Sequence, residues 1–291
     1  MYNAIGSGKM RRHLGLGLKL FVAMAAAGFA LYPIGWVIGA SLDPTNSLVN
    51  QSLIPGRVTF DNFVRLGNDP QHPFFLWLWN SVKVSGISAV IIVTLTALAA
   101  YSFSRFRYKG RRMSLLFILL IQLFPNMLAM VALFLLLQQI GKVVPWLGLN
   151  THGGLILIYS GGALGFNTWL MKGYFDTIPR DLDESALIDG ASHLQAFRHV
   201  LLPLVRPILV VIGVLSFIGT YSDFLLARVM LKSTEQYTMA VGMALFIRGQ
   251  YQQEWGVFSA AALIGALPIV LIFLILQGQL IGGLTQGATK G

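Results

Sequence analysis

The stretch "DESALIDGASHLQAFRHVLLPL", from Asp183 to Leu204, concentrates polar side chains in a chain that is otherwise strongly apolar. Asp183 and Glu184, with Asp181 just before them, place carboxylates at the start of a predicted helix, where they complement its positive end. No Ser–His–acid set accompanies them, and the five histidines are scattered over different connections. The stretch is a candidate coupling device or, alternatively, an amphipathic loop that lies on the lipid headgroups, and we expect no catalysis in this chain.

A second polar group follows the apolar patch "MAVGMALF", in the run "IRGQYQQEWG". Amides and carboxylates hydrogen-bond to sugar hydroxyls, and aromatic rings cover sugar C–H surfaces. The same composition also suits an interfacial turn whose Trp and Tyr anchor at lipid headgroups. The run contains Gly249, Gln250, Tyr251, Gln252 and Gln253, followed by Glu254 and Trp255.

A single acidic residue, Asp223, falls inside a predicted membrane span. Acids within a membrane usually face protein or water. Asp223 is therefore a candidate to line a pathway together with Tyr221 and Ser222. The alternatives are that it pairs with Arg228 or lies near the outer interface.

Two glycine-containing motifs are candidates for ligand sites. "GSGK", near the start, lacks the first glycine and the final Ser/Thr of a phosphate-binding loop, and no strand precedes it. We expect no cofactor in this chain. Gly161, Gly162 and Gly165 indicate close helix packing or, alternatively, unwound backbone at a substrate site.

The composition indicates an integral membrane protein. Of 291 residues, 55% are hydrophobic and 11% charged, against roughly a quarter charged in soluble domains. There is no cysteine, which excludes disulfides and thiolate metal sites. The net charge of +10 comes from basic residues at the ends of apolar stretches, so it indicates orientation and not nucleic-acid binding.

The apolar stretches predict an all-α protein with about six transmembrane helices, because each is near the 20 residues that a bilayer requires. A leader, 1–13, precedes a single transmembrane domain, 14–291, and Pro125 is expected to kink the third span. Residues 176–206 form a cytoplasmic loop, and residues 282–291 a cytoplasmic tail. The spans are 14–42, 75–103, 113–139, 155–175, 207–231 and 260–281, and the outer loops are 43–74, 140–154 and 232–259.

The basic residues fall mainly in alternate connections: the leader, the segment after the second span, the loop around Arg198, and the tail. The positive-inside rule therefore places both termini and the polar stretch in the cytoplasm.

The polar stretch is predicted to form an elbow of two short helices. Gly190 can adopt a left-handed backbone and end the first helix, and Ser192 can cap the second. Pro203 and Pro207 interrupt the pattern where the fifth span begins. Apolar stripes are expected at Leu182 and Ala186, and at Leu194, Phe197 and Leu201.

The order of residues resembles the signature loop of ABC-importer permeases: Glu-Ala-Ala, three residues, Gly, nine residues, then Ile-x-Leu-Pro. Segments such as "AYSFSRFRYKGRR" and "NTWLMKGYFDTIPRDLDESA" extend the resemblance to sugar-importer permeases over nearly the whole chain, and the end, "GGLTQGATKG", is similar to the second permease of maltose/maltodextrin transporters. Ser185 stands for the first Ala and Val200 for the Ile. The matching residues are Glu184, Ala186, Gly190, Leu202 and Pro203.

The resemblance implies a type I ABC-importer permease fold in a bacterial inner membrane, with the elbow as a coupling helix. The implied partners are two ATP-binding subunits, a second permease and an extracytoplasmic sugar-binding protein. ATPase coupling would rest on Glu184, Ser185, Ala186, Gly190, Leu202 and Pro203. Residues 249–253 would contact the binding protein, and the tail would enter the ATPase interface. A stand-alone secondary transporter and a membrane scaffold are the alternatives.

Overall fold

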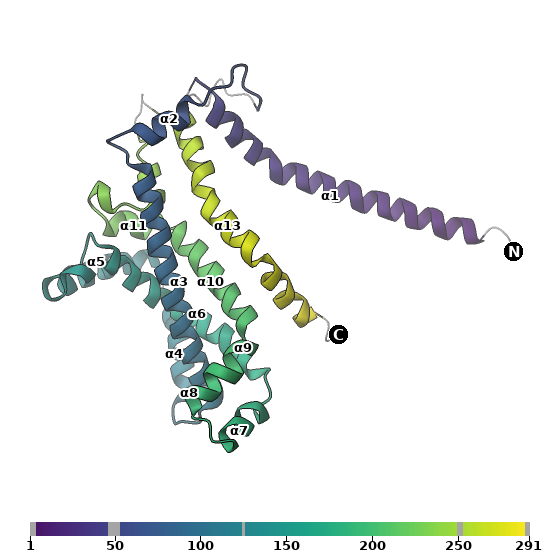
Figure 1. Ribbon diagram of the computed structural model, residues 1–291, viewed down its shortest axis with the longest axis vertical. Coiled ribbons are helices and arrows are strands. Elements are labelled where there is room, and N and C mark those ends of the chain that lie inside the picture. Colours follow the sequence, from purple (N-terminus) through teal and green to yellow (C-terminus); the bar gives the residue numbers. More distant parts are fainter. Residues whose placement is uncertain (1–3, 46–52, 124–125, 249–252, 289–291) are drawn as a thin grey trace. The chain divides into compact units, whose positions relative to one another are not determined.

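The computed structural model describes residues 4–45, 53–123, 126–248 and 253–288 (Figure 1). These residues form helices and connections and contain no strand. Their contacts divide into two compact units. The first consists of Met1–Gln71 with Leu245–Ile264, and the second of His72–Ala244 with Gly265–Gly291.

The first unit contains α1 (Ala4–Leu42), α2 (Asp61–Asn68) and the first turns of α13. The buried amide of Asn62 donates hydrogen bonds to the carbonyl oxygens of Ser41, at 3.0 Å, and Asp43, at 2.9 Å. These bonds hold α2 against the end of α1. The apolar side chains of α1 from Leu16 to Ile38 are largely exposed, as expected of a helix that contacts lipid or another subunit.

The second unit is built around α3 (Phe74–Arg105), α6 (His152–Asp176) and α10 (Arg206–Tyr221), which pack against one another. Ala97 and Ala100 of α3 form part of a buried apolar cluster with residues of α6 and α10. Small residues on α3 allow the neighbouring helices to approach closely.

Short helices complete the second unit. The elbow, residues 181–204, consists of α7 (Asp181–Ile188), α8 (His193–Ala196), the π-helical turn η2 (Phe197–Leu201) and α9 (Leu202–Leu204). The other elements of the second unit are α4 (Arg111–Gln122), α5 (Asn126–Val143), η1 (Pro145–Leu147), α11 (Leu225–Met230), η3 (Thr234–Gln236), α12 (Met239–Met243) and the later part of α13 (Trp255–Ala288).

The observed helices differ from the six predicted spans. Within the described residues, four single helices are long and apolar enough to cross a membrane, and a bent pair ending in α10 would make five. The predicted span 113–139 is divided between α4 and α5, and the predicted kink residue, Pro125, lies outside the described residues. The predicted leader and tail are also largely helical, because α1 begins at Ala4 and α13 continues to Ala288.

The predicted span 207–231 is broken between α10 and α11. Asp223 lies in the break, and its Oδ1 atom accepts a hydrogen bond from the backbone N–H of Ala227 at 3.0 Å. A short acidic side chain that caps the next helix in this way competes with continuation of the preceding helix. Asp223 therefore precedes α11 and does not lie within a continuous span.

The first turns of α3 hold the connection between α11 and α12. Trp77 Nε1 donates to the carbonyl oxygen of Thr234 at 2.8 Å, and the amide of Asn80 donates to those of Glu235 and Tyr237 at 2.9 and 3.0 Å. The side chain of Trp77 is fully buried. The indole is used for packing and for a loop contact.

Candidate functional site

The first arm of the elbow, α7, has the end signals that its sequence predicts. Asp181, Asp183 and Glu184 occupy the first turn. At the other end Gly190 has φ +89°, and the N–H of Ala191 donates to the carbonyl of Ala186 at 2.9 Å. This bond, with that from Gly190 to Leu187 at 3.1 Å, forms a Schellman motif, which ends a helix at a left-handed glycine.

The second arm begins with a capping box. The backbone N–H of Ser192 donates to Gln195 Oε1 at 2.7 Å, and that of Gln195 donates to Ser192 Oγ at 3.3 Å. The predicted cap at Ser192 is confirmed, and Gln195 completes it. After η2 and α9 the chain bends by 78° into α10. The arms are therefore short, capped helices on either side of a fixed turn.

An aromatic cluster attaches the second arm to the membrane helices. Phe197 and Leu201 are buried with Tyr101 of α3 and Phe175 of α6. The rings of Tyr101 and Phe197 lie 4.8 Å apart between centroids, and the Tyr101 hydroxyl donates to the carbonyl of His193 at 3.2 Å. The elbow is thus packed against the apolar cluster formed at the C-terminal ends of α3 and α6.

A buried ion pair attaches the first arm. Arg105 Nε lies 3.1 Å from Asp183 Oδ2, with the two side chains 5% and 11% exposed. The contact is not aligned as a hydrogen bond, and Asp183 Oδ1 has no hydrogen-bond partner among the described residues. Arg105 also donates to the carbonyl of Ile178 at 3.0 Å. Asp183 therefore anchors the elbow to α3, a role that helix-dipole reasoning did not suggest.

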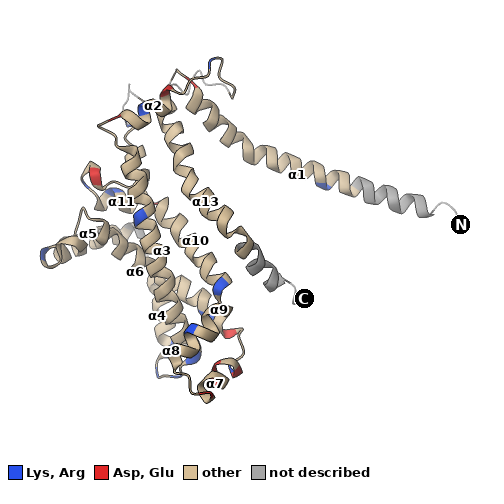
Figure 2. Cartoon of the chain, in the orientation of Figure 1, with Lys and Arg blue, Asp and Glu red and all other residues tan. Residues whose placement is uncertain are grey.

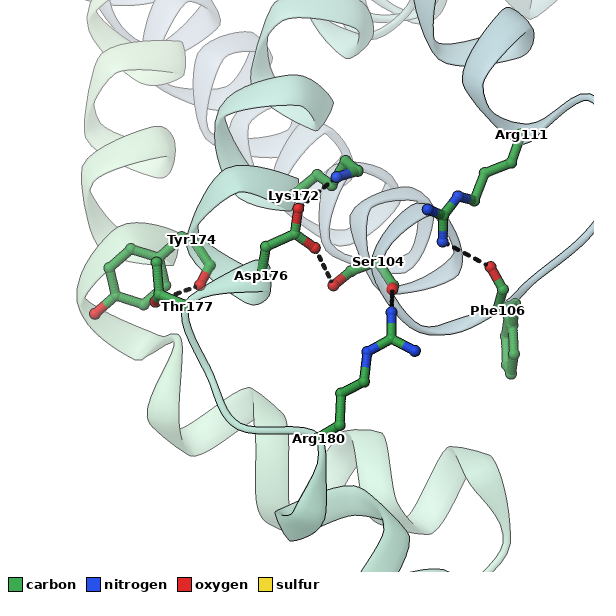
Figure 3. Close-up of polar contacts among 8 residues, drawn as sticks. All are labelled: Ser104, Phe106, Arg111, Lys172, Tyr174, Asp176, Thr177 and Arg180. Carbon is green, nitrogen blue, oxygen red and sulfur yellow. Dashed lines mark hydrogen bonds and ion pairs between the residues drawn. The ribbon is translucent and has the colours of Figure 1, made fainter.

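Neighbouring contacts continue this attachment, as Figure 3 shows. Arg180 donates to the carbonyl of Ser104 at 2.9 Å, and the Ser104 hydroxyl donates to Asp176 Oδ1 at 2.7 Å. Because Ser104 belongs to α3, Asp176 to α6 and Arg180 precedes α7, these contacts connect all three elements.

The outer side of the elbow presents an acidic and apolar surface. Glu184 and Ser185 are exposed, and Glu184 forms no ion pair with the described residues. Acidic residues gather on α7 (Figure 2). Two large apolar side chains, Ile188 and Leu194, are 86% and 67% exposed. Exposed apolar side chains beside a carboxylate are typical of a protein-docking surface.

The structure corrects the predicted apolar stripe on the second arm. Phe197 and Leu201 are buried as expected, but Leu194 points outward, since the chain changes to a π-helical turn after Ala196 and the helical spacing no longer holds. Among the other predicted coupling residues, Ala186 and Leu202 are half-buried, whereas Gly190 and Pro203 are exposed.

A cavity of about 600 Å³ lies between α5, α6 and α10. Asp223 lines it, and its Oδ1 atom accepts a hydrogen bond from the Tyr159 hydroxyl at 2.8 Å. The predicted alternative partner, Arg228, donates to the Tyr237 hydroxyl at 2.9 Å and forms no ion pair with Asp223. Most other lining residues are apolar, but Asn167, Ser216 and Thr220 add polar groups.

The other two candidate pathway residues do not line this cavity. The buried Tyr221 hydroxyl donates to the carbonyl of Gly265 at 2.7 Å, and Ser222 is exposed beyond the end of α10. Of the three consecutive candidates only Asp223 is brought to the cavity. Tyr159 and Asn167, which the sequence did not single out, lie there instead.

The glycines of α6 have two different surroundings. Gly165 packs against α4, because a Cβ atom there would lie 2.8 Å from the carbonyl oxygen of Ile118. Gln122 of α4 bridges α6, donating to the carbonyl of Gly162 at 2.7 Å and accepting from the N–H of Phe166 at 2.8 Å. Gly161 and Gly162 line the cavity. The alternative of unwound backbone is wrong, since α6 is helical throughout.

Part of the predicted binding-protein contact loop, Gly249, Gln250, Tyr251 and Gln252, lies outside the described residues, as do residues 289–291 of the predicted tail. Gln253 is exposed, and its side-chain oxygen accepts a hydrogen bond from Trp255 Nε1 at 2.9 Å.

Comparison with known proteins gives consistent results. The chain is 42% identical to the maltose/maltodextrin transport system permease protein MalG of Salmonella typhimurium, covering 95% of this chain and 94% of the relative. It is 44% identical to MalG of Photorhabdus laumondii, covering 93% of each chain. Its fold is similar to a chain of a bacterial ABC transporter involved in the import of the acidic polysaccharide alginate, with a TM-score of 0.76, 25% identity, and coverage of 92% and 96%.

Residues 75–284 match the family described as binding-protein-dependent transport system inner membrane component. The matched range includes the whole elbow, α6 and α10, and almost all of α3. The all-α fold, the apolar helices and these relatives agree, and the chain belongs to this family of inner-membrane permease components.

Proposed function

We propose that this chain is a permease subunit of an ATP-driven, binding-protein-dependent importer of maltose/maltodextrin-type sugars. The observation that carries the proposal is the exposed elbow fixed to membrane helices by the Arg105–Asp183 pair and by the aromatic cluster. The sugar class is supported by relatives of maltose/maltodextrin transport systems that are 42–44% identical over more than nine-tenths of the chain.

The elbow is the docking element for an ATP-binding subunit. Its exposed Glu184 offers a charge for a basic group on the partner, and Ile188 and Leu194 offer apolar area. A complete importer would contain two such ATPases, which bind ATP and Mg²⁺, together with a second permease. This chain supplies the joint that transmits their movement.

Movement of the elbow would reach the membrane by two routes. The first arm pulls on α3 through Arg105, and the second arm continues through η2 and α9 into α10. Since α3, α6 and α10 pack together, a rigid displacement of the elbow shifts them as one group. Such a displacement is the motion that alternating access requires.

The cavity that contains Asp223 is the part of this chain that would face the translocation pathway. Its Tyr159–Asp223 hydrogen bond and the Asn167 side chain provide groups that can bind sugar hydroxyls in mainly apolar surroundings. On the outer side of the membrane, residues 249–253 would contact the sugar-binding protein. The basic residues favour cytoplasmic termini.

The decisive experiment separates ATP hydrolysis from transport in reconstituted membranes. Glu184→Ala removes the docking charge, and Gly190→Pro fixes an incompatible backbone angle at φ +89°. Both variants should assemble in the membrane but lose sugar uptake, with the ATP hydrolysed per sugar raised severalfold. Asp181→Ala, which removes another exposed carboxylate of the same turn, is the matched control. Normal uptake by both test variants would show that the elbow is only a surface loop.

A further inference from the structure

A polar cavity of about 400 Å³ lies where α3 and α6 end and α4 begins. Figure 3 shows several of the residues that line it. This polar cavity is unlike the apolar cavity that contains Asp223, and the proposed transport cycle assigns no role to it. Four basic side chains line it, against a single carboxylate, that of Asp176. The basic residues are Arg105, Arg111, Lys172 and Arg180.

Two of these basic groups are already paired with carboxylates. Lys172 forms an ion pair with Asp176 one helical turn later, and Arg105 pairs with Asp183. These two cations are therefore neutralised within the chain. The carboxylates of Asp176 and Asp183 are therefore already engaged in ion pairs.

Arg111 and Arg180 have no carboxylate partner among the described residues. Arg111 donates one hydrogen bond, to the carbonyl of Phe106 at 3.2 Å, and Arg180 donates one, to the carbonyl of Ser104 at 2.9 Å. A guanidinium group carries five N–H donors. Both groups therefore keep donors free beside a polar cavity, which has an excess of two positive charges.

The start of α4 adds to this positive potential. Its first turn contains Arg111 and Arg112 but no acidic residue, and no side chain caps it. The unsatisfied N–H groups of a helix start carry partial positive charge. Oxygen-rich anions bind such surroundings, and guanidinium groups favour phosphate because two parallel hydrogen bonds can form.

The depth of the cavity distinguishes a lipid phosphate from other anions. α6 has 25 residues and so rises about 38 Å, compared with a hydrocarbon core of about 30 Å and about 40–45 Å with headgroups. The C-terminal end of α6, where the cavity lies, is therefore at the level of the headgroups. Met113, Phe117 and Leu120 share one face of α4 and are 72%, 63% and 60% exposed. The acyl chains of a lipid can pack along that face of α4.

We propose that this pocket binds the phosphate of an anionic phospholipid such as phosphatidylglycerol, held by Arg111 and Arg180 with its acyl chains along α4. A bound lipid would neutralise the two unpaired guanidinium groups beside the elbow. The proposal concerns a lipid site and does not depend on which sugar is carried.

The test uses the full-length chain purified with its partner subunits in detergent. Native mass spectrometry measures binding of phosphatidylglycerol, of zwitterionic phosphatidylethanolamine and of inorganic phosphate. Arg111→Gln/Arg180→Gln should weaken phosphatidylglycerol binding about tenfold or more, because it removes the charge-assisted contacts. Arg107→Gln/Lys109→Gln removes the same charge from exposed positions outside the pocket and should change binding less than about threefold.

Three outcomes would overturn the proposal. Equal affinity of the unaltered chain for both lipids excludes an anion-selective lipid site, and displacement by equimolar inorganic phosphate indicates a free-anion site. Unchanged lipid binding with loss of a partner subunit from the test variant indicates that a protein carboxylate occupies the pocket. If the test variant does not fold, a photoactivatable phosphatidylglycerol decides, since it should label the peptide around Arg111 in the unaltered chain.

Discussion

Breaking the Arg105–Asp183 pair should loosen the elbow while leaving the membrane helices folded. Asp183→Asn leaves the Arg105 guanidinium buried without its counter-charge, and Arg105→Gln leaves the Asp183 carboxylate in the same position. The double variant leaves neither charge. The contact joins α3 to α7 across 78 positions of sequence, so its loss acts on the attachment of the elbow and not on either helix alone.

The size of the effect follows from burial and geometry. Removal of one partner of a buried pair costs about 3–5 kcal/mol. These side chains are 5% and 11% exposed, but Asp183 Oδ1 has no hydrogen-bond partner among the described residues. The imperfect geometry favours the lower end, about 3 kcal/mol. At about 1.4 kcal/mol per factor of ten, local opening of the elbow rises on the order of a hundredfold.

Hydrogen exchange measures this opening directly in the assembled transporter. The backbone N–H groups of Glu184 and Asp189, which donate to the carbonyls of Arg180 and Ser185, should exchange about a hundredfold faster in each single variant. Exchange in α6 should not change. The double variant should open less than the sum of the single effects, because no uncompensated charge remains. Strictly additive effects, or unchanged exchange in α7, would refute the conclusion that the Arg105–Asp183 pair holds the elbow to α3.

Other outcomes test different parts of the chain. A cysteine at His193 should react with impermeant reagents only from the cytoplasmic side, and labelling from outside would reverse the topology. A Gly/Ser linker over 249–253 should reduce uptake and ATPase stimulation by the binding protein while basal ATPase activity is kept; full stimulation would contradict that role. Truncation after Leu284 should weaken assembly or coupling, whereas an unchanged complex would assign the tail no role. Gly242→Ala should lower the melting temperature of the complex by several degrees, because the added Cβ would lie 2.0 Å from the buried Trp77 ring; an unchanged melting temperature would contradict this packing.

Features of the elbow that depend on neighbouring residues could be predicted from the sequence. The left-handed Gly190 and the cap at Ser192 follow from the few conformations that can end or begin a helix. The bend before α10 follows from two prolines, which cannot continue a helix undisturbed. Local rules were sufficient here because each feature is completed within five residues.

Features that depend on distant partners could not be predicted. Hydrophobicity alone predicts a single span over 207–231. In the structure Asp223 accepts a hydrogen bond from Tyr159 on another helix and precedes α11, which breaks that span. Trp77 is fully buried because its indole N–H donates to the carbonyl of Thr234, a partner far along the chain that the sequence does not indicate. In each case a polar group found its partner through tertiary packing.

In the proposed transport cycle, the two attachments of the elbow would allow it to transmit movement to the membrane helices. A flexible loop would absorb the movement of a docked ATPase, since exposed polar segments reorganise at little cost. Here the first arm ends in a Schellman motif and the second begins with a capping box, and both are fixed to membrane helices: α7 to α3 by the ion pair with Arg105, and η2 to the α3–α6 cluster by Phe197. A force on the exposed surface at Glu184 therefore has no local route of relaxation. It must either break a buried pair or move α3, α6 and α10, and moving packed helices as a group preserves their contacts.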